Sequence, residues 1–366
     1  MNRNNLWIHL ALAVSLIAVA AIIGQVSRWE TTEKWRGEKP APKQQNKACA
    51  MARSAEEREP EVLVKFRSNL SLSEIQKIAA KQNDRIEDEI ESVAGLTSID
   101  DLDGRSAQQV VEEYKRLGDV VEYAEPNLQI RLDPETSEQN PPFPAGEDNK
   151  DNLPDDPLFG VQWALRNIGQ NNGKEKADLD ALRAWEKTKG KSDVVVAVLD
   201  TGVDYTHQDL TANIWTRPDS IAAYKDNELG TISDEHGFNA SDNARDPMDE
   251  NGHGTHCAGI IGAEGDNSEG IAGINWNVQI MPLKFLGRGG FGTTKDAIEA
   301  INYAIERKKA GVNIRVISAS WGSTAYSRAL EDVIRKAGEE GILFVAAAGN
   351  ASTDNDSTPH YPSSYK

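Results

Sequence analysis

Residues 194–199 read Val-Val-Val-Ala-Val-Leu, an unbroken apolar run. Such a run is typical of a strand that is buried on both faces, as in a parallel sheet. Three further apolar strands and three helical patterns follow in alternation, at 278–286, 314–320, 343–348 and at 253–261, 293–309, 327–340. This alternation predicts an α/β domain whose parallel sheet is covered by helices on both faces.

The first run ends in Asp200-Thr201-Gly202. Open α/β sheets place ligands and chemistry just beyond the carboxyl ends of their strands, so Asp200 is a candidate functional residue. An aspartate that only caps the turn fits this tripeptide about equally well.

A glycine-flanked histidine, His253, opens the next helix, which is rich in small residues. His256 follows three positions later, and such a pair raises the possibility of a metal site. The metalloprotease pattern needs two histidines four apart with a glutamate between them, and neither condition is met. We therefore expect no zinc.

The pattern Gly287-x-Gly289-x-x-Gly292 lies between a predicted strand and a predicted helix, as in dinucleotide-binding folds. That reading needs an acidic residue at the end of the next strand. No acidic residue lies between Arg307 and Leu330. We therefore expect no nucleotide or other organic cofactor.

An upstream unit, residues 59–132, has the order strand, helix, strand, strand, helix, strand. This order predicts a small α+β domain of the ferredoxin-like, split βαβ kind. The unit gathers no histidine, cysteine or acidic constellation suited to catalysis, which favours an interaction role.

The remaining segments predict export. Residues 6–26 within the leader 1–27 are mostly apolar, and a cleaved signal peptide and an uncleaved membrane anchor both fit their length. Residues 28–58 form a spacer and residues 133–155 an acidic, proline-rich linker before the domain at 156–366. We expect a secreted protein, or one anchored at the outer face of the cell membrane.

Charge and cysteine content narrow the function further. The chain of 366 residues has 40 Lys+Arg against 58 Asp+Glu, a net charge of −18. This balance argues against nucleic acid as a partner. The two cysteines, Cys49 and Cys257, lie in separate segments, so we expect no disulfide, and we read Cys257 as a small buried hydrophobe.

Four motifs together resemble the subtilisin-like serine proteases, the subtilases or peptidase S8 family. In chain order they are Asp200-Thr201-Gly202-Val203-Asp204, His253-Gly254-Thr255-His256-Cys257-Ala258-Gly259, Ser320-Trp321-Gly322 and Ala347-Ala348-Gly349-Asn350. The likeness runs from about residue 156 to the last residue. The unit at 59–132 resembles the family's propeptide, which acts as folding template and intramolecular inhibitor with its last strand in the substrate cleft.

The resemblance implies roles for individual residues. Asp200 orients His253, which acts as general base and then general acid. Asn350 supplies an oxyanion-hole amide, although an ordinary turn asparagine also fits. Two edge segments bind an extended protein or peptide substrate, and they are Ser320-Trp321-Gly322 and Gly290-Phe291-Gly292. For Trp321, packing in the core is the alternative.

The resemblance also implies structural Ca²⁺. The side chains of Asp209 and Asn267, with the backbone oxygens of Glu269 and Ile271, match a calcium site of the family, and oxygen ligands suit this ion. A weaker second site uses aspartates of one loop, Asp242, Asp246 and Asp249. A solvated acidic surface is the alternative for both.

One family feature is missing. The nucleophile lies in a Gly-Thr-Ser-Met-Ala segment that does not occur in these residues. We therefore expect an incomplete peptidase domain that is inactive by itself and exposes an apolar edge near 343–348. The alternative is a non-catalytic protein whose propeptide-like unit binds or inhibits another protease.

Overall fold

The computed structural model describes residues 61–133, 153–227, 230–241 and 246–366. The leader 1–27, the spacer 28–58 and most of the linker lie outside these ranges. Within the described residues no helix combines the length and apolar character that crossing a membrane requires. The candidate anchor at 6–26 lies outside the described residues.

The first part is the predicted α+β unit. Its elements are β1 (Glu61–Phe66), α3 (Leu72–Lys81), β2 (Asp84–Glu89), β3 (Leu96–Asp101), α4 (Ala107–Lys115) and β4 (Val121–Pro126). The strands form an antiparallel sheet in the order β2-β3-β1-β4, which is the ferredoxin-like order. Both helices begin with capping boxes, Ser71 with Glu74 and Ser106 with Gln109.

The unit ends in two strand segments, β4 and a separate short strand, β5 (Gln129–Arg131). β5 does not join the antiparallel sheet but pairs with the later strand β11 (Phe291–Thr293). The first unit is thus joined to the second by a strand pair.

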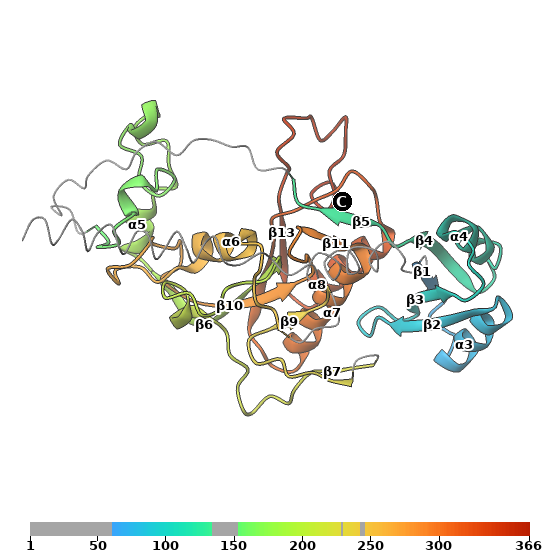
Figure 1. Ribbon diagram of the computed structural model, residues 1–366. Coiled ribbons are helices and arrows are strands. Elements are labelled where there is room, and N and C mark those ends of the chain that lie inside the picture. Colours follow the sequence, from blue (N-terminus) through green and yellow to red (C-terminus); the bar gives the residue numbers. More distant parts are fainter. Residues whose placement is uncertain (1–60, 134–152, 228–229, 242–245) are drawn as a thin grey trace, which may run out of the picture. The chain divides into compact units, whose positions relative to one another are not determined.

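The second part contains a five-stranded sheet in the order β13-β12-β6-β10-β9. Each neighbouring pair is parallel, as the sequence predicts. The strands are β6 (Gly190–Asp200), β9 (Phe238–Asn239), β10 (Asn277–Lys284), β12 (Ile314–Ala319) and β13 (Leu343–Ala346). The apolar run lies in β6, the central strand, and Figure 1 shows this sheet with its neighbouring helices.

Alternate residues of β6 serve the two faces of the sheet. Ala197 and Leu199 belong to a core that includes residues of α7 (Thr294–Lys309) and α8 (Arg328–Glu339). Val198 belongs to a second core, under α6 (His253–Gly262). Because both faces are covered, every position of the run is apolar.

The edge strand β13 is poorly covered. Leu343 is 63 % exposed and Val345 is 47 % exposed. Apolar side chains at this level of exposure on an edge strand favour association with other chains, as we expected for 343–348.

A buried acidic contact joins the two parts. Asp88 on β2 and Glu299 on α7 are 4 % and 8 % exposed, and each has a carboxyl oxygen without a hydrogen-bond partner. Burial, together with the charge of Asp88, raises the pKa of Glu299 well above its usual value. Lys295 opposes this shift and Asp226 adds to it, while Lys295 pairs with Glu87 at 2.7 Å.

We predict that this contact weakens as the pH rises above 4.5, the ordinary glutamate pKa. A raised folded-state pKa means that the contact is favourable while Glu299 is protonated, and that its stability falls as the pH approaches the raised value. Glu299→Gln imitates the neutral form and is expected to flatten this dependence. Differential scanning calorimetry of the full chain between about pH 5 and pH 8 measures it.

The matched control is Glu306→Gln, which changes a partly exposed glutamate of the same helix that pairs with Lys309. It should keep the wild-type slope of melting temperature against pH. Equal slopes for Glu299→Gln and the wild type would contradict the prediction.

Candidate active site

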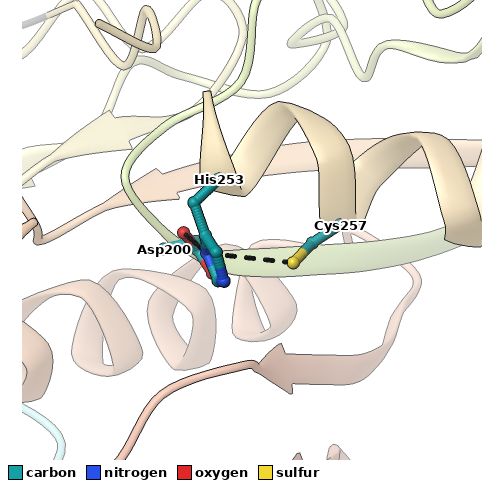
Figure 2. A group of neighbouring side chains, drawn as sticks. All are labelled: Asp200, His253 and Cys257. Carbon is teal, nitrogen blue, oxygen red and sulfur yellow. Dashed lines mark hydrogen bonds and ion pairs between the residues drawn. The ribbon is translucent and has the colours of Figure 1, made fainter. Parts of the chain in front are cut away.

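The site begins where β6 ends. Asp200 is its last residue and has a side chain only 1 % exposed, whereas that of His253, the first residue of α6, is 25 % exposed. His253 Nδ1 lies 2.7 Å from Asp200 Oδ1. Figure 2 shows the two side chains in contact. The structure thus brings together the two residues that the sequence singled out.

This approach depends on two glycines. Gly202 has φ +102°, in the left-handed region, and a Cβ atom on Gly254 would lie 2.1 Å from the Gly202 oxygen. A larger residue at Gly254 would therefore push α6 away from the end of β6.

The electrostatics favour a protonated imidazole. The hydrogen bond to Asp200 and, secondarily, the contact with Cys257 raise the pKa of His253 to about 10, although burial opposes the shift. A donor at Nδ1 leaves Nε2 of the neutral ring as a proton acceptor. The pair can thus hold a tautomer suited to general-base chemistry.

Asp249 organises the turn before α6. Its carboxylate accepts hydrogen bonds from Gly252 N at 3.0 Å, Thr255 N at 3.0 Å, Thr255 Oγ1 at 2.6 Å and Thr201 Oγ1 at 2.9 Å. Burial is the largest single influence and raises the pKa of Asp249, but these bonds together outweigh it and hold the pKa below its usual value. Sequence reasoning missed this role, for which the only signal was an acid four residues before His253.

Two of the three aspartates predicted for the second calcium site, Asp246 and Asp249, lie within the described residues. Asp249 uses both oxygens on protein donors, and Asp246 Oδ1 accepts from Tyr205 OH and Met248 N. Asp242 lies outside the described residues.

Cys257 lies one turn along α6, with its Sγ 3.9 Å from His253 Nδ1 (Figure 2). It is a free thiol and packs against the apolar core under the helix, but it is only partly buried, contrary to our expectation. His256, three residues after His253, is exposed.

The two predicted edge segments flank β5. Gly292 and Phe291 lie in β11 opposite Ile130 and Arg131, and Leu132 N donates to Gly290 O at 3.0 Å. On the other side Arg131 pairs with Gly322 in an antiparallel bridge. An extended segment of the first unit therefore lies between these two edges and pairs with both.

Trp321 belongs to the core. Its side chain is buried, packs against Phe285, and donates from Nε1 to Leu199 O at 2.9 Å. This side chain therefore follows the alternative that we weighed, and Ser320 beside it is half-buried.

Asn350 lies in the loop after β13 and is exposed. Its backbone N–H donates to Asp133 Oδ2 at 3.2 Å. The loop therefore faces the residue that follows the β5 segment.

Residues predicted for the first calcium site lie close together. Asp209 is 3 % exposed and accepts from Asn267 Nδ2 and Ile271 N, each at 3.0 Å. The Glu269 side chain instead accepts from Gln208 Nε2 at 2.8 Å. At Gly270 a Cβ atom would lie 2.2 Å from Asp209 Oδ2, so the loop closes tightly on the carboxylate.

Sequence reasoning missed one residue here, Asp156. It is 4 % exposed, its Oδ1 has no hydrogen-bond partner, and burial with the nearby charge of Asp209 raises its pKa. Two buried carboxylates beside amide and carbonyl oxygens fit a hard divalent cation. No local signal marks Asp156, which precedes Asp209 by 53 residues.

Both parts of the chain match models of known protein families. Residues 191–366 match the model of the subtilase family, and residues 44–127 match that of the fervidolysin N-terminal prodomain. The chain therefore carries a peptidase domain of the subtilase family, preceded by a fervidolysin-like prodomain.

Two serine proteases of known sequence are similar to this chain. A thermophilic serine proteinase of Bacillus sp. (strain AK1) is 31 % identical over 316 residues, which are 84 % of this chain and 62 % of that protein. Thermitase of Thermoactinomyces vulgaris is 32 % identical over 212 residues, 58 % of this chain and 62 % of thermitase. This chain thus spans about three fifths of these relatives.

A solved structure is similar as well. Fervidolysin from Fervidobacterium pennivorans, described as a keratinolytic enzyme related to subtilisin, superposes with a TM-score of 0.55 at 26 % identity. The match covers 84 % of this chain and 42 % of fervidolysin. The subtilisin-like fold with its N-terminal prodomain is therefore present.

We predict that Asp200→Asn lowers the pKa of His253 from about 10 toward the ordinary 6.5, because it removes the carboxylate that stabilises the imidazolium. An NMR titration of the histidine ring signals measures this. Cys257→Ala is the control and should produce a smaller decrease. An unchanged pKa in Asp200→Asn would show that the pair does not form.

Proposed function

We propose that this protein is the precursor of a serine endopeptidase that hydrolyses protein or peptide substrates, with Asp200 and His253 in its catalytic triad. The observation that carries the proposal is the 2.7 Å contact between His253 Nδ1 and the buried Asp200 carboxylate. The subtilase domain supplies the class of reaction. The Gly-Thr-Ser-Met-Ala segment that carries the family's nucleophile does not occur in residues 1–366.

In this mechanism the neutral His253 takes the serine proton at Nε2 while the hydroxyl oxygen attacks the peptide carbonyl. Asp200 stabilises the imidazolium that forms, and His253 then returns the proton to the leaving amine. Asn350 donates a hydrogen bond to the oxyanion. Because the base form is needed, activity should rise as the pH increases through the pKa of His253.

The prodomain acts as an intramolecular inhibitor. Its β5 pairs with β11 and with Gly322, where an extended substrate would add a strand. Glu125 accepts from Ser327 Oγ at 2.6 Å and from Arg328 N at 2.9 Å at the start of α8, where a carboxylate is favoured. Tethering adds a high effective concentration.

We also propose that the protein is exported, and either secreted or anchored at the outer face of the membrane through residues 6–26. The apolar leader supports this location.

A structural Ca²⁺ ion completes the proposal. Asp209, Asn267 and Asp156 would hold it with the backbone oxygens of Glu269 and Ile271. The unpartnered buried oxygen of Asp156 supports this assignment. The ion would neutralise two buried carboxylates and stabilise the loop at 266–271.

We predict that residues 1–366 alone neither hydrolyse a chromogenic peptide nor react stoichiometrically with a fluorophosphonate probe. A longer form that includes a Gly-Thr-Ser-Met-Ala segment should do both. His253→Ala in that form should reduce kcat by more than about 10⁴-fold, because triad members act as a unit. Full activity of the His253→Ala variant would contradict the proposed mechanism.

For calcium, we predict that Asp156→Ala weakens Ca²⁺ binding at least about tenfold, because a hard cation depends on its anionic oxygen ligands. Isothermal titration calorimetry on the full chain measures the affinity, and the melting temperature with and without chelator checks it. The control is Asp219→Ala, which changes an exposed aspartate. Equal affinity in wild type and Asp156→Ala would exclude this site.

A further inference from the structure

The imidazole of His360 packs onto two glycines beside the segment that contains β5. A Cβ atom on Gly322 would lie 1.9 Å from His360 Cε1, and one on Gly349 would lie 3.1 Å from Nε2. Gly322 belongs to an edge that pairs with β5, and Gly349 precedes Asn350. The ring therefore lies between the edge that contains Gly322 and the loop that contains Asn350.

The two ring nitrogens of His360 have different surroundings. Nδ1 lies 3.4 Å from Ser363 Oγ, whereas Nε2 is buried and has no hydrogen-bond partner. The Asp133 Oδ2 atom lies 3.9 Å from Nε2, and the His360 side chain is 12 % exposed. A buried nitrogen without a partner carries a desolvation cost that a closer acceptor would remove.

The backbone pairing of the β5 segment places Asp133 beside His360. Arg131 pairs with Gly322, and Leu132 N donates to Gly290 O at 3.0 Å. The next residue is Asp133, whose Oδ2 accepts from Asn350 N at 3.2 Å. One carboxylate oxygen therefore faces both a backbone N–H and the buried His360 nitrogen.

We infer that His360 is a specificity-determining residue and that the cleft prefers substrates with Asp or Glu at the position that Asp133 occupies. This inference rests on the proposed endopeptidase function. A protonated His360 offers a charge-assisted hydrogen bond to a carboxylate.

The first test uses the prodomain itself. Hydrogen exchange at the Leu132 amide, which is bonded to Gly290, is measured in the full chain at about pH 6, near the ordinary histidine pKa. Asp133→Asn and His360→Gln should each accelerate exchange, and the double variant should be no faster than either one. Additive effects would overturn the inference. His207→Gln, at an exposed histidine, is the control and should leave exchange unchanged.

The second test uses a longer form that carries the serine segment, and two peptides that differ only in Asp or Asn at this position. Wild type should favour the Asp peptide in kcat/KM by about tenfold or more, and His360→Gln should bring the ratio close to one. Hydrolysis of both peptides at equal rates by wild type would overturn the inference. If neither peptide is hydrolysed, the proposed endopeptidase function fails, and the exchange test still decides the role of His360.

Discussion

The packing of α6 against the end of β6 is the constraint on which the candidate site depends. A Cβ atom at Gly254 would lie 2.1 Å from the Gly202 oxygen, so the helix can start at this place only if that residue has no side chain. The buried run before Asp200 fixes the strand in the centre of the sheet, and Asp249 fixes the first turn of the helix. The 2.7 Å contact between His253 and Asp200 is a consequence of these two anchors.

Features encoded in short segments could be predicted from the sequence. The apolar run and the glycine-flanked histidine indicated a parallel sheet with Asp200 and His253 at its carboxyl edge, and the comparisons confirm the subtilisin-like fold. Whether Trp321 faces the cleft or the core depends on which neighbours surround its ring. The pattern around it contained no information on Phe285 and Leu199, which hold it in the core.

Features assembled from distant segments could not be predicted in the same way. Asp156 joins Asp209 across 53 residues, and neither segment alone shows that both carboxylates are buried together. The pairing of β5 with β11 has the same origin, because an edge strand can pair with any compatible edge. Alternation of apolar and polar residues fixes which face of a strand is buried but does not identify its partner.

Two kinds of interaction hold the prodomain against the second part of the chain, and they respond differently to pH. The β5 contacts with β11 and Gly322 are backbone hydrogen bonds, which do not titrate. The contacts farther along α7 and α8 depend on carboxyl groups, since Glu125 caps α8 and Glu299 faces Asp88. Burial raises the pKa of both Glu125 and Glu299. A rise in pH therefore weakens the carboxyl contacts of the prodomain sheet, because their raised pKa values favour the protonated forms. The backbone pairing of β5 with β11 and Gly322 persists through the same change.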